Sequence, residues 1–273
     1  MTAKIINNNT IHVYDLSQFD TDAIMHSGQV FRYFKTDTGY QLISGKHFAE
    51  IIPQRDKVII KCDDSSYWYN YFDLPTDYNE IKKELGVFEQ LLPAIKLGGG
   101  IRILRGEFHE IVISFIISAN NNIKRFTKTL NLLAEQYGDK LSNRLCAFPT
   151  LDQLTKVTAE DFKKLGCGYR SSYLVKAVKQ LKEIDIELLR KMPTAELTKT
   201  LLQIQGVGKK VCACVELFAG DLHRLEVCPV DTWIQKALEQ LGETDKTAIL
   251  NHKYAGVAQQ YIFYYLQHLR KKL

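Results

Sequence analysis

The stretch "IQGVGKKVCACVELFAGDLHRLEVCPVDTW", residues Ile204–Trp233, decides how the second half of the chain folds. Gly206 and Gly208 lie two positions apart and are followed directly by Lys209, Lys210 and an apolar run. Glycine adopts positive φ and lets a neighbouring chain approach the backbone closely. The stretch therefore predicts a tight turn that opens a helix, whose first amides and positive dipole end suit a phosphate. A plain turn between two helices is the alternative for the two glycines alone.

The apolar residues around the glycines make the pattern more specific. Leu202, Ile204 and Val207 surround the turn, and the segment before it, "TAELTKTLLQI", has helical periodicity. This arrangement resembles the helix–hairpin–helix element, which grips a DNA backbone without reading its sequence. We expect the element over about residues 195–219.

Lys210 and Asp231 are the two residues of the stretch with catalytic potential. Lys210 falls in the first turn of the second helix, where the dipole disfavours a cation and favours the neutral amine that nucleophilic attack needs. Lys209 points about 100° away around that helix and suits a phosphate contact instead. Asp231 opens a further helix, expected over about 231–241, where it would cap the first turn and remain charged. A solvated lysine and a plain helix cap are the alternatives.

Composition sets limits on the class of protein. The chain has 273 residues, 45% hydrophobic and 25% charged, with a net charge of +5, which permits a polyanionic partner without requiring one. Its N-terminus, "MTAKIINNNTIHVYDL", lacks the apolar centre of a secretion signal, and no run of about 18 apolar residues occurs. We expect no membrane association and a location in the cytoplasm, with the nucleoid, or in the nucleus of a eukaryote.

The six cysteines favour reduced thiols in a reducing compartment. They form no CxxC pair and have no histidines at zinc spacing. The C-terminal stretch "YIFYYLQHLRKKL" contains no cysteine, which excludes an iron–sulfur loop there. We expect neither a metal nor an organic cofactor.

The predicted secondary structure changes near residue 80 from strands to helices. Before it, "GQVFRYF", "GYQLISG", "FAEIIPQ" and "KVIIKC" are short β-rich runs separated by turn residues. After it, helical patterns dominate, including the apolar "HEIVISFIISA", which predicts a buried helix. The fold is predicted to be α+β, with a small antiparallel sheet domain and trailing helix over residues 1–97 and a helical body over 98–273.

Four further stretches, in order along the chain, make the resemblance narrower. They are "SGQVFRYF" (27–34), "SFIISANNNIKR" (114–125), "LGCGYRSSY" (165–173) and "YAGVAQQYIF" (254–263). With the helix–hairpin–helix and the downstream aspartate, the chain resembles the 8-oxoguanine DNA glycosylase family of base-excision repair enzymes. The resemblance covers most of the chain and implies double-stranded DNA with oxidised guanine as the partner, and a protein acting as a monomer.

The resemblance implies how the family's DNA contacts map onto this chain. An enzyme that works on a stacked base must extrude it and fill the space left behind. Asn120 matches the asparagine that enters this space, and Tyr169 matches the aromatic wedge beside the estranged base. Arg125 and Arg170 match the two arginines that contact the acceptors of the opposite cytosine. Considered alone, Asn120 is a turn residue and the arginines are phosphate contacts or surface charges.

The base pocket is implied in the same way. Gly28 matches the residue whose carbonyl accepts the N7 hydrogen of 8-oxoguanine, which guanine lacks. Cys214 and Phe263 match the two faces that sandwich the base, and Gln259 matches the side chain on its Watson–Crick edge. Core packing is the alternative for Cys214 and Phe263. The chain departs from the family at Trp233, where eukaryotic members carry a histidine.

The implied activity is that of a bifunctional glycosylase and lyase: Lys210 attacks C1′ with assistance from Asp231, and β-elimination then nicks the strand. Two other functions remain open. One is a related helix–hairpin–helix glycosylase for a different damaged base. The other is a non-enzymatic helix–hairpin–helix DNA-binding module, in which Lys210 and Asp231 would be dispensable.

Overall fold

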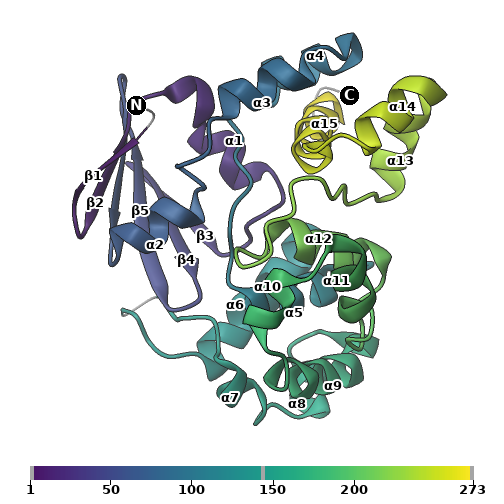
Figure 1. The fold of residues 1–273 in the computed structure, drawn as a ribbon. Helices are drawn as coiled ribbons and strands as arrows, with labels where there is room; N and C mark the ends of the chain where they lie inside the picture. Colours follow the sequence, from purple (N-terminus) through teal and green to yellow (C-terminus); the bar gives the residue numbers. More distant parts are fainter. Residues whose placement is uncertain (1–2, 143–144, 271–273) are drawn as a thin grey trace.

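A six-stranded antiparallel sheet forms the N-terminal part of the molecule within residues 3–142 and 145–270, which the computed structural model describes (Figure 1). Its strand order is β1-β2-β6-β5-β4-β3, and consecutive strands pair mostly through short turns. Alternate residues of β4 and β6, such as Leu42 and Ile60, are buried, so one face of the sheet builds a core. The strands are β1 (Ala3–Asn7), β2 (Thr10–Val13), β3 (Tyr33–Thr36), β4 (Gly39–Ser44), β5 (His47–Pro53) and β6 (Val58–Cys62).

Helices dominate the rest of the described chain and confirm the α+β prediction. Asp, Asn or Thr caps the N-terminus of many of them, as in the capping box of Thr150 and Gln153. The helices are α1 (Thr21–His26), α2 (Ser65–Tyr71), α3 (Tyr78–Leu85), α4 (Leu92–Gly98), α5 (Phe108–Ser118), α6 (Ile123–Tyr137), α7 (Leu151–Leu154), α8 (Ala159–Lys164), α9 (Ser171–Lys182), α10 (Ile186–Lys191), α11 (Thr194–Leu201), α12 (Lys209–Phe218), α13 (Thr232–Glu239), α14 (Glu243–Leu250) and α15 (Ala255–Arg270). None of the helices in the described part of the chain is both long and apolar enough to cross a membrane.

Helix α5 is the centre of the helical body, as its apolar sequence predicts. It packs against α12, α9 and α6, and its residues are buried almost without interruption. Because both α5 and α12 contribute to one core, the start of α12 is held against the C-terminal half of α5. This contact positions Lys210.

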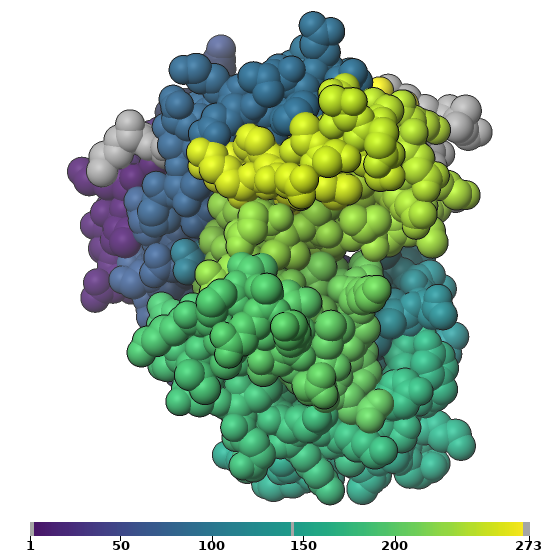
Figure 2. All heavy atoms as spheres, turned by 45° about the vertical axis from the view of Figure 1, so that its right-hand side comes forward, coloured from purple at the N-terminus to yellow at the C-terminus, as the bar shows by residue number. Residues whose placement is uncertain are grey.

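The two parts of the molecule share a core. Helices α3 and α4 follow the sheet in sequence, yet their apolar residues join the core of the body, and α4 packs along α15. Figure 2 shows the C-terminal residues directly against the surface of the segment that contains α3 and α4. Buried Arg102 stabilises the same region, between the sheet part and the helical body, through hydrogen bonds. Its guanidinium donates to the carbonyls of Gln18 and Phe72, at 3.2 and 2.8 Å.

Residues 28–32 are not a strand, contrary to the expectation from "GQVFRYF"; β3 begins only at Tyr33. Gly28 has φ +80°, which ends regular pairing. The buried Gln29 amide then replaces a strand partner: it donates to the Arg102 carbonyl at 2.9 Å and accepts from the Leu104 amide at 2.8 Å. This segment therefore joins the sheet to the body instead of extending the sheet.

Candidate active site

The glycine turn joins α11 to α12 and is fixed by its neighbours. Gly206 has φ +89°, and a Cβ there would lie 3.1 Å from the Cβ of Tyr173 on α9. The Gln180 side chain of α9 holds the turn, donating to the Gln203 carbonyl at 2.9 Å and accepting from the Gln205 amide at 2.8 Å. Gly206 is thus required by conformation and by space.

Gly208 differs from Gly206 because its backbone is ordinary, with φ −91°, and it occupies the N-cap position of α12. A Cβ added there would meet no atom of the described chain within 4 Å. The first amides of α12 therefore open onto unfilled space, next to the exposed Lys209. Such a helix N-terminus is suited to a phosphate.

Lys210 and Asp231 line one cavity of about 860 Å³, a volume large enough for a nucleobase. The inner cavity, as we call it, is lined by Gly28, Phe115, Lys210, Asp231, Trp233 and Phe263 among others. Its lining residues come from the segment before β3, from α5, α6 and α12, and from the start of α13 and from α15. The Nζ of Lys210 lies 5.2 Å from the centre of the Phe115 ring. Residues far apart in the sequence thus place an amine, a carboxylate and aromatic rings in one hollow.

Asp231 caps α13, as expected. Its Oδ1 accepts from the amides of Trp233 and Ile234, both at 3.0 Å. Oδ2 accepts no hydrogen bond from the described part of the chain. One oxygen therefore fixes the carboxylate of a residue that lines the inner cavity, and the other oxygen is not engaged in capping.

Cys214 is buried one helical turn after Lys210 on α12. Burial raises the pKa of the Cys214 thiol, the adjacent Lys210 ammonium opposes this rise, and the Asp231 carboxylate adds to it. The thiol therefore stays protonated and apolar near Lys210. Cys214 is not among the lining residues of the inner cavity, so its predicted place against one face of the base stays a prediction.

The base-pocket residues divide into two groups. Gly28 and Phe263 lie side by side on the lining of the inner cavity and touch each other: a Cβ on Gly28 would lie 2.9 Å from Cε1 of Phe263. Gln259 is instead buried below the lining, where its Oε1 accepts from the Gln260 side chain at 2.8 Å. Gln267, one turn beyond Phe263 on α15, lies on the lining in its place. The sequence analysis missed Gln267, although its spacing of four residues from Phe263 places both on one helix face.

A second hollow of about 800 Å³ adjoins the glycine turn. The outer cavity, as we call it, is lined by Asn120, Tyr169, Arg170, Gly206, Gly208 and Lys209, and it shares Lys210, Asp231 and Trp233 with the inner cavity. The predicted backbone contacts and three of the four predicted opposite-base residues therefore lie together. Arg125 is exposed near the start of α6, where Asn122 caps the Arg125 amide at 2.9 Å.

Asn120 and Tyr169 project from the protein at the outer cavity. Asn120 is an exposed residue in the left-handed region, with φ +51°, which asparagine tolerates better than most residues. Tyr169 is 60% exposed and contacts the Tyr173 ring edge to face. Exposed apolar area of this size at a cavity rim suits contact with a partner.

Arg170 is folded inward in this structure. Its guanidinium donates to the carbonyls of Ala119 and Asn120, the latter at 3.0 Å, and its Cζ lies 4.4 Å from the centre of the Tyr169 ring. Arg170 therefore holds the turn that carries Asn120 and supports the Tyr169 ring. In this conformation its terminal NH groups are engaged within the protein, whereas Nε has no hydrogen-bond partner in the described part of the chain.

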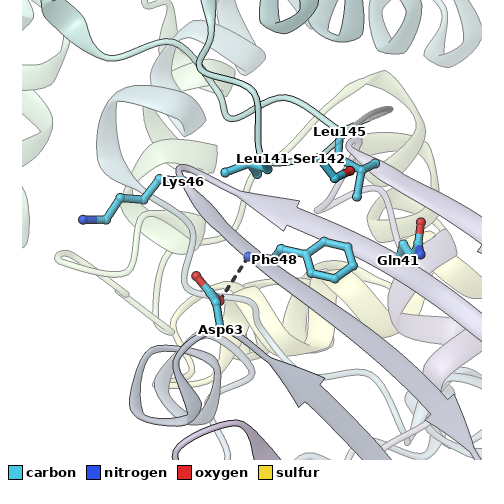
Figure 3. A pocket seen from close by; sticks show the side chains of 7 residues that line it. All are labelled: Gln41, Lys46, Phe48, Asp63, Leu141, Ser142 and Leu145. Carbon is cyan, nitrogen blue, oxygen red and sulfur yellow. Dashed lines mark hydrogen bonds between the residues drawn. The ribbon is translucent and has the colours of Figure 1, made fainter.

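A third cavity, of about 670 Å³, lies on the sheet and contains none of the predicted site residues (Figure 3). Gln41, Lys46, Phe48 and Asp63 line it from the strands, and Leu141, Ser142 and Leu145 line it from the facing loop. Burial alone would raise the pKa of Asp63, but hydrogen bonds from Trp68, Phe48 and His47 lower it overall. The Asp63 carboxylate thus organises the end of the central strand β6 beside the start of β5.

Two family profiles together match most of the chain. Residues 12–112 match the family described as "8-oxoguanine DNA glycosylase, N-terminal domain". Residues 113–255 match the family described as "HhH-GPD superfamily base excision DNA repair protein". The first match covers most of the sheet, and the second covers the glycine turn, Lys210 and Asp231.

Similar proteins carry consistent names. The N-glycosylase/DNA lyase OGG1 of Arabidopsis thaliana is 37% identical over 50% of this chain and 39% of its own length. The N-glycosylase/DNA lyase of Saccharomyces cerevisiae is 32% identical over 50% of this chain and 40% of its own length. The matches therefore span about two fifths of these relatives.

A solved structure matches over the whole length of both chains. It is the Clostridium acetobutylicum 8-oxoguanine glycosylase/lyase in complex with double-stranded DNA containing cytosine opposite 8-oxoguanine. It aligns with a TM-score of 0.90 and 32% identity, covering 99% of this chain and 100% of that chain. The likeness thus includes the sheet, the helical body and both cavities' walls.

Proposed function

The chain belongs to the 8-oxoguanine DNA glycosylase family, within the helix–hairpin–helix superfamily of base-excision repair proteins, and on this basis we propose that it excises 8-oxoguanine from duplex DNA and then nicks the strand. The observation that carries the proposal is the grouping of Lys210 and Asp231 with Gly28 and Phe263 in the inner cavity. A non-enzymatic DNA-binding module has no use for an amine and a carboxylate beside a base-sized hollow.

In the proposed reaction, DNA binds across the glycine turn and the damaged nucleotide is extruded. The amides of α12 and the side chain of Lys209 contact the backbone, while the base enters the inner cavity. Asn120 and Tyr169, which project at the outer cavity, occupy the space that the base leaves. We further propose that one copy of the chain suffices, because the grouped residues come from a single chain.

Lys210 is the proposed nucleophile. Its Nζ attacks C1′, and the N-glycosidic bond breaks with its electron pair leaving on the base, which takes up a proton. Opening of the sugar ring then gives a Schiff base between Nζ and C1′. Loss of a C2′ proton and cleavage of the C3′–O bond nick the strand by β-elimination. Asp231 stabilises the positive charge that develops on the sugar, because its second oxygen is not engaged in capping.

Base recognition is proposed to rest on the backbone at Gly28. A carbonyl there accepts the N7 hydrogen of 8-oxoguanine, whereas guanine presents a lone pair and leaves the carbonyl unsatisfied. Gly28 suits this role because its left-handed backbone and lack of a side chain let Phe263 approach closely. The phenyl ring then packs against one face of the base, and the buried Cys214 lies toward the other face.

The opposite base is proposed to be cytosine, read by Arg125 and Arg170. Cytosine offers two acceptors, O2 and N3, to a guanidinium once its partner is gone. Arg125 is exposed and accessible for this contact, whereas Arg170 must first exchange its carbonyl partners.

The test is single-turnover cleavage of duplexes that carry 8-oxoguanine opposite each of the four bases, with and without borohydride. We expect base release and strand nicking, fastest opposite cytosine, and a borohydride-trapped covalent complex. If the protein cleaved a duplex with a different damaged base but no 8-oxoguanine duplex, that other base would be the substrate. Binding without cleavage or trapping of any duplex would support the binding module instead.

A further inference from the structure

Trp233 occupies the junction of the inner and outer cavities. It lines both hollows together with Lys210 and Asp231, and 40% of its surface is exposed. The chain has two tryptophans, and the other, Trp68, is completely buried beneath the sheet. An indole is the largest apolar side chain, so its exposure beside a lysine and a carboxylate calls for an explanation.

The backbone fixes Trp233 relative to the active-site carboxylate. The Trp233 amide donates to Oδ1 of Asp231 at 3.0 Å, in the first turn of α13. The indole is therefore attached one residue beyond a group whose position is set by the cap. Any movement of Asp231 toward or away from the substrate moves Trp233 with it.

The substrate must pass this junction. With the base in the inner cavity and the DNA backbone at the outer cavity, the deoxyribose between them has to lie where the two hollows meet, because its C1′ must reach Lys210, which lines both. Trp233 lines the same two hollows. Its ring carries no charge to neutralise a phosphate, but it offers an apolar face and one N–H donor.

We propose that Trp233 is a substrate-binding residue that packs its indole against the deoxyribose of the extruded nucleotide and so holds C1′ at Lys210. The inference rests on the proposed function for the identity of the reacting sugar. The contact removes exposed apolar surface from water, so its strength depends little on salt. Lys209, also at the outer cavity, provides the contrast, because contact between its ammonium and a phosphate releases counterions and weakens with salt.

The binding experiment uses a duplex with a tetrahydrofuran abasic site opposite cytosine, which has the sugar ring but no base to excise. We expect Trp233→Ala to weaken its binding about tenfold or more, as loss of an aromatic stacking partner does. Trp233→Phe should retain most of the affinity. Neither variant should change the dependence of log K on log salt, whereas the control Lys209→Ala should lower its slope by about 1.

Fluorescence provides a second readout. Binding of the same duplex should change the emission of the wild-type protein, because Trp233 is exposed and becomes covered while Trp68 is buried throughout. The change should be absent in Trp233→Phe. On the duplex with 8-oxoguanine opposite cytosine, Trp233→Ala should raise the KM of cleavage more than it lowers kcat.

Either of two results would overturn the inference. The first is that Trp233→Ala binds the abasic duplex as tightly as wild type and that binding changes the fluorescence of Trp233→Phe as it does that of wild type. The second is that the slope of log K against log salt falls in Trp233→Ala as it does in Lys209→Ala. Failure of the proposed function is separable. A wild-type protein that binds the abasic duplex with a fluorescence change, but leaves 8-oxoguanine duplexes intact, would refute the excision and retain the contact.

Discussion

At the scale of single residues, neighbours in sequence are predicted to serve different purposes. Lys209 and Lys210 both lie at the start of α12. Lys210 lies near the Phe115 ring and lines both cavities, whereas Lys209 lines the outer cavity but not the inner one. A rotation of about 100° per residue separates the two side chains. We therefore expect Lys210 to contact the base and sugar of the DNA, and Lys209 to contact its phosphate backbone.

Lys210→Gln should abolish base release and borohydride trapping, because an amide cannot form a Schiff base. The expected loss of rate is on the order of 10³-fold or more, as for other nucleophile removals. Lys209→Gln is the matched control and should still be trapped. Thermal unfolding should change little in either variant, since both lysines are exposed. Trapping that persists in Lys210→Gln would assign the nucleophile to another amine.

Asp231→Asn separates the cap from the catalytic charge. Asparagine caps helices as well as aspartate does, so the free energy of unfolding should shift by less than about 1 kcal/mol. Turnover of the 8-oxoguanine duplex should fall by about 10²-fold or more, because the developing positive charge loses its partner. Equal activity of the two proteins in single-turnover assays would leave Asp231 as a cap only.

Arg125→Ala tests reading of the opposite base more directly than Arg170→Ala does. The loss of Arg125 should reduce the preference for cytosine by about 1–3 kcal/mol, the value of a good contact to a base. The free energy of unfolding should change less, because Arg125 is exposed. Arg170 also holds the carbonyls of Ala119 and Asn120, so its loss should lower cleavage opposite all four bases. Cleavage of the four duplexes by both variants measures the difference. Uniform losses in Arg125→Ala would indicate a phosphate contact.

At the scale of elements, the sequence predicts long, regular segments well and irregular ones poorly. The buried helix "HEIVISFIISA" is α5, and the runs at 39–45, 48–54 and 57–62 are β4 to β6 with shifts of about a residue. The expected continuous helix after residue 79 is broken at Gly86 into α3 and α4, because local turn geometry interrupts the apolar period. Strands β1 and β2 were missed because both are short, and because β1 exposes Ile5 and Ile6 and therefore lacks the alternation of buried apolar and exposed polar residues.

The candidate site shows the same division. The positions of Lys210 and Asp231 on their helices follow from glycine spacing and capping rules, which act locally. The burial of Gln259 and the inward fold of Arg170 depend on how α15 and α9 pack. Tertiary contacts of this kind have no signature in the local pattern.

The glycine turn permits a matched pair of substitutions. Gly206→Ala should lower the free energy of unfolding by about 1–3 kcal/mol, because φ is +89° and Tyr173 leaves no room for a Cβ. Gly208→Ala should affect folding less, since its φ is ordinary and an added Cβ meets no described atom within 4 Å. It should instead weaken DNA binding, as the methyl group enters the space of the phosphate. Urea unfolding and fluorescence anisotropy measure the two effects, and equal destabilisation would contradict this assignment.

At the scale of the whole molecule, the sheet and the body are joined through charge as well as through the shared core. Asp73 and His223 both adopt left-handed backbone conformations, with φ +48° and +45°, and the Nε2 of His223 lies 3.3 Å from Oδ2 of Asp73. Arg105 approaches Oδ1 of Asp73 at 3.7 Å, and the Tyr78 hydroxyl donates to Oδ2 at 3.1 Å. A buried carboxylate thus connects segments from both parts of the chain.

This carboxylate gives the fold a dependence on acid. Burial alone would raise the pKa of Asp73, but His223, Thr76 and Arg102 lower it overall from its usual 3.8. A depressed pKa in the folded state stabilises the protein at pH values above 3.8, and this contribution is lost as the pH falls below it. Asp73→Asn should lower the free energy of unfolding at pH 7 by about 1.5–3 kcal/mol, and the difference from wild type should shrink below pH 4. A constant difference across a pH series of urea unfolding curves would contradict this link.

Arg170 has a consequence for the lifetime of the complex. In the free protein its guanidinium already bonds to the carbonyls of Ala119 and Asn120, so a contact with cytosine exchanges old hydrogen bonds for new ones and leaves their number nearly unchanged. The exchange happens after encounter, when the duplex already lies on the glycine turn. We therefore expect duplexes with cytosine or another opposite base to associate at similar rates and to differ in residence time, with the correct pair dissociating more slowly.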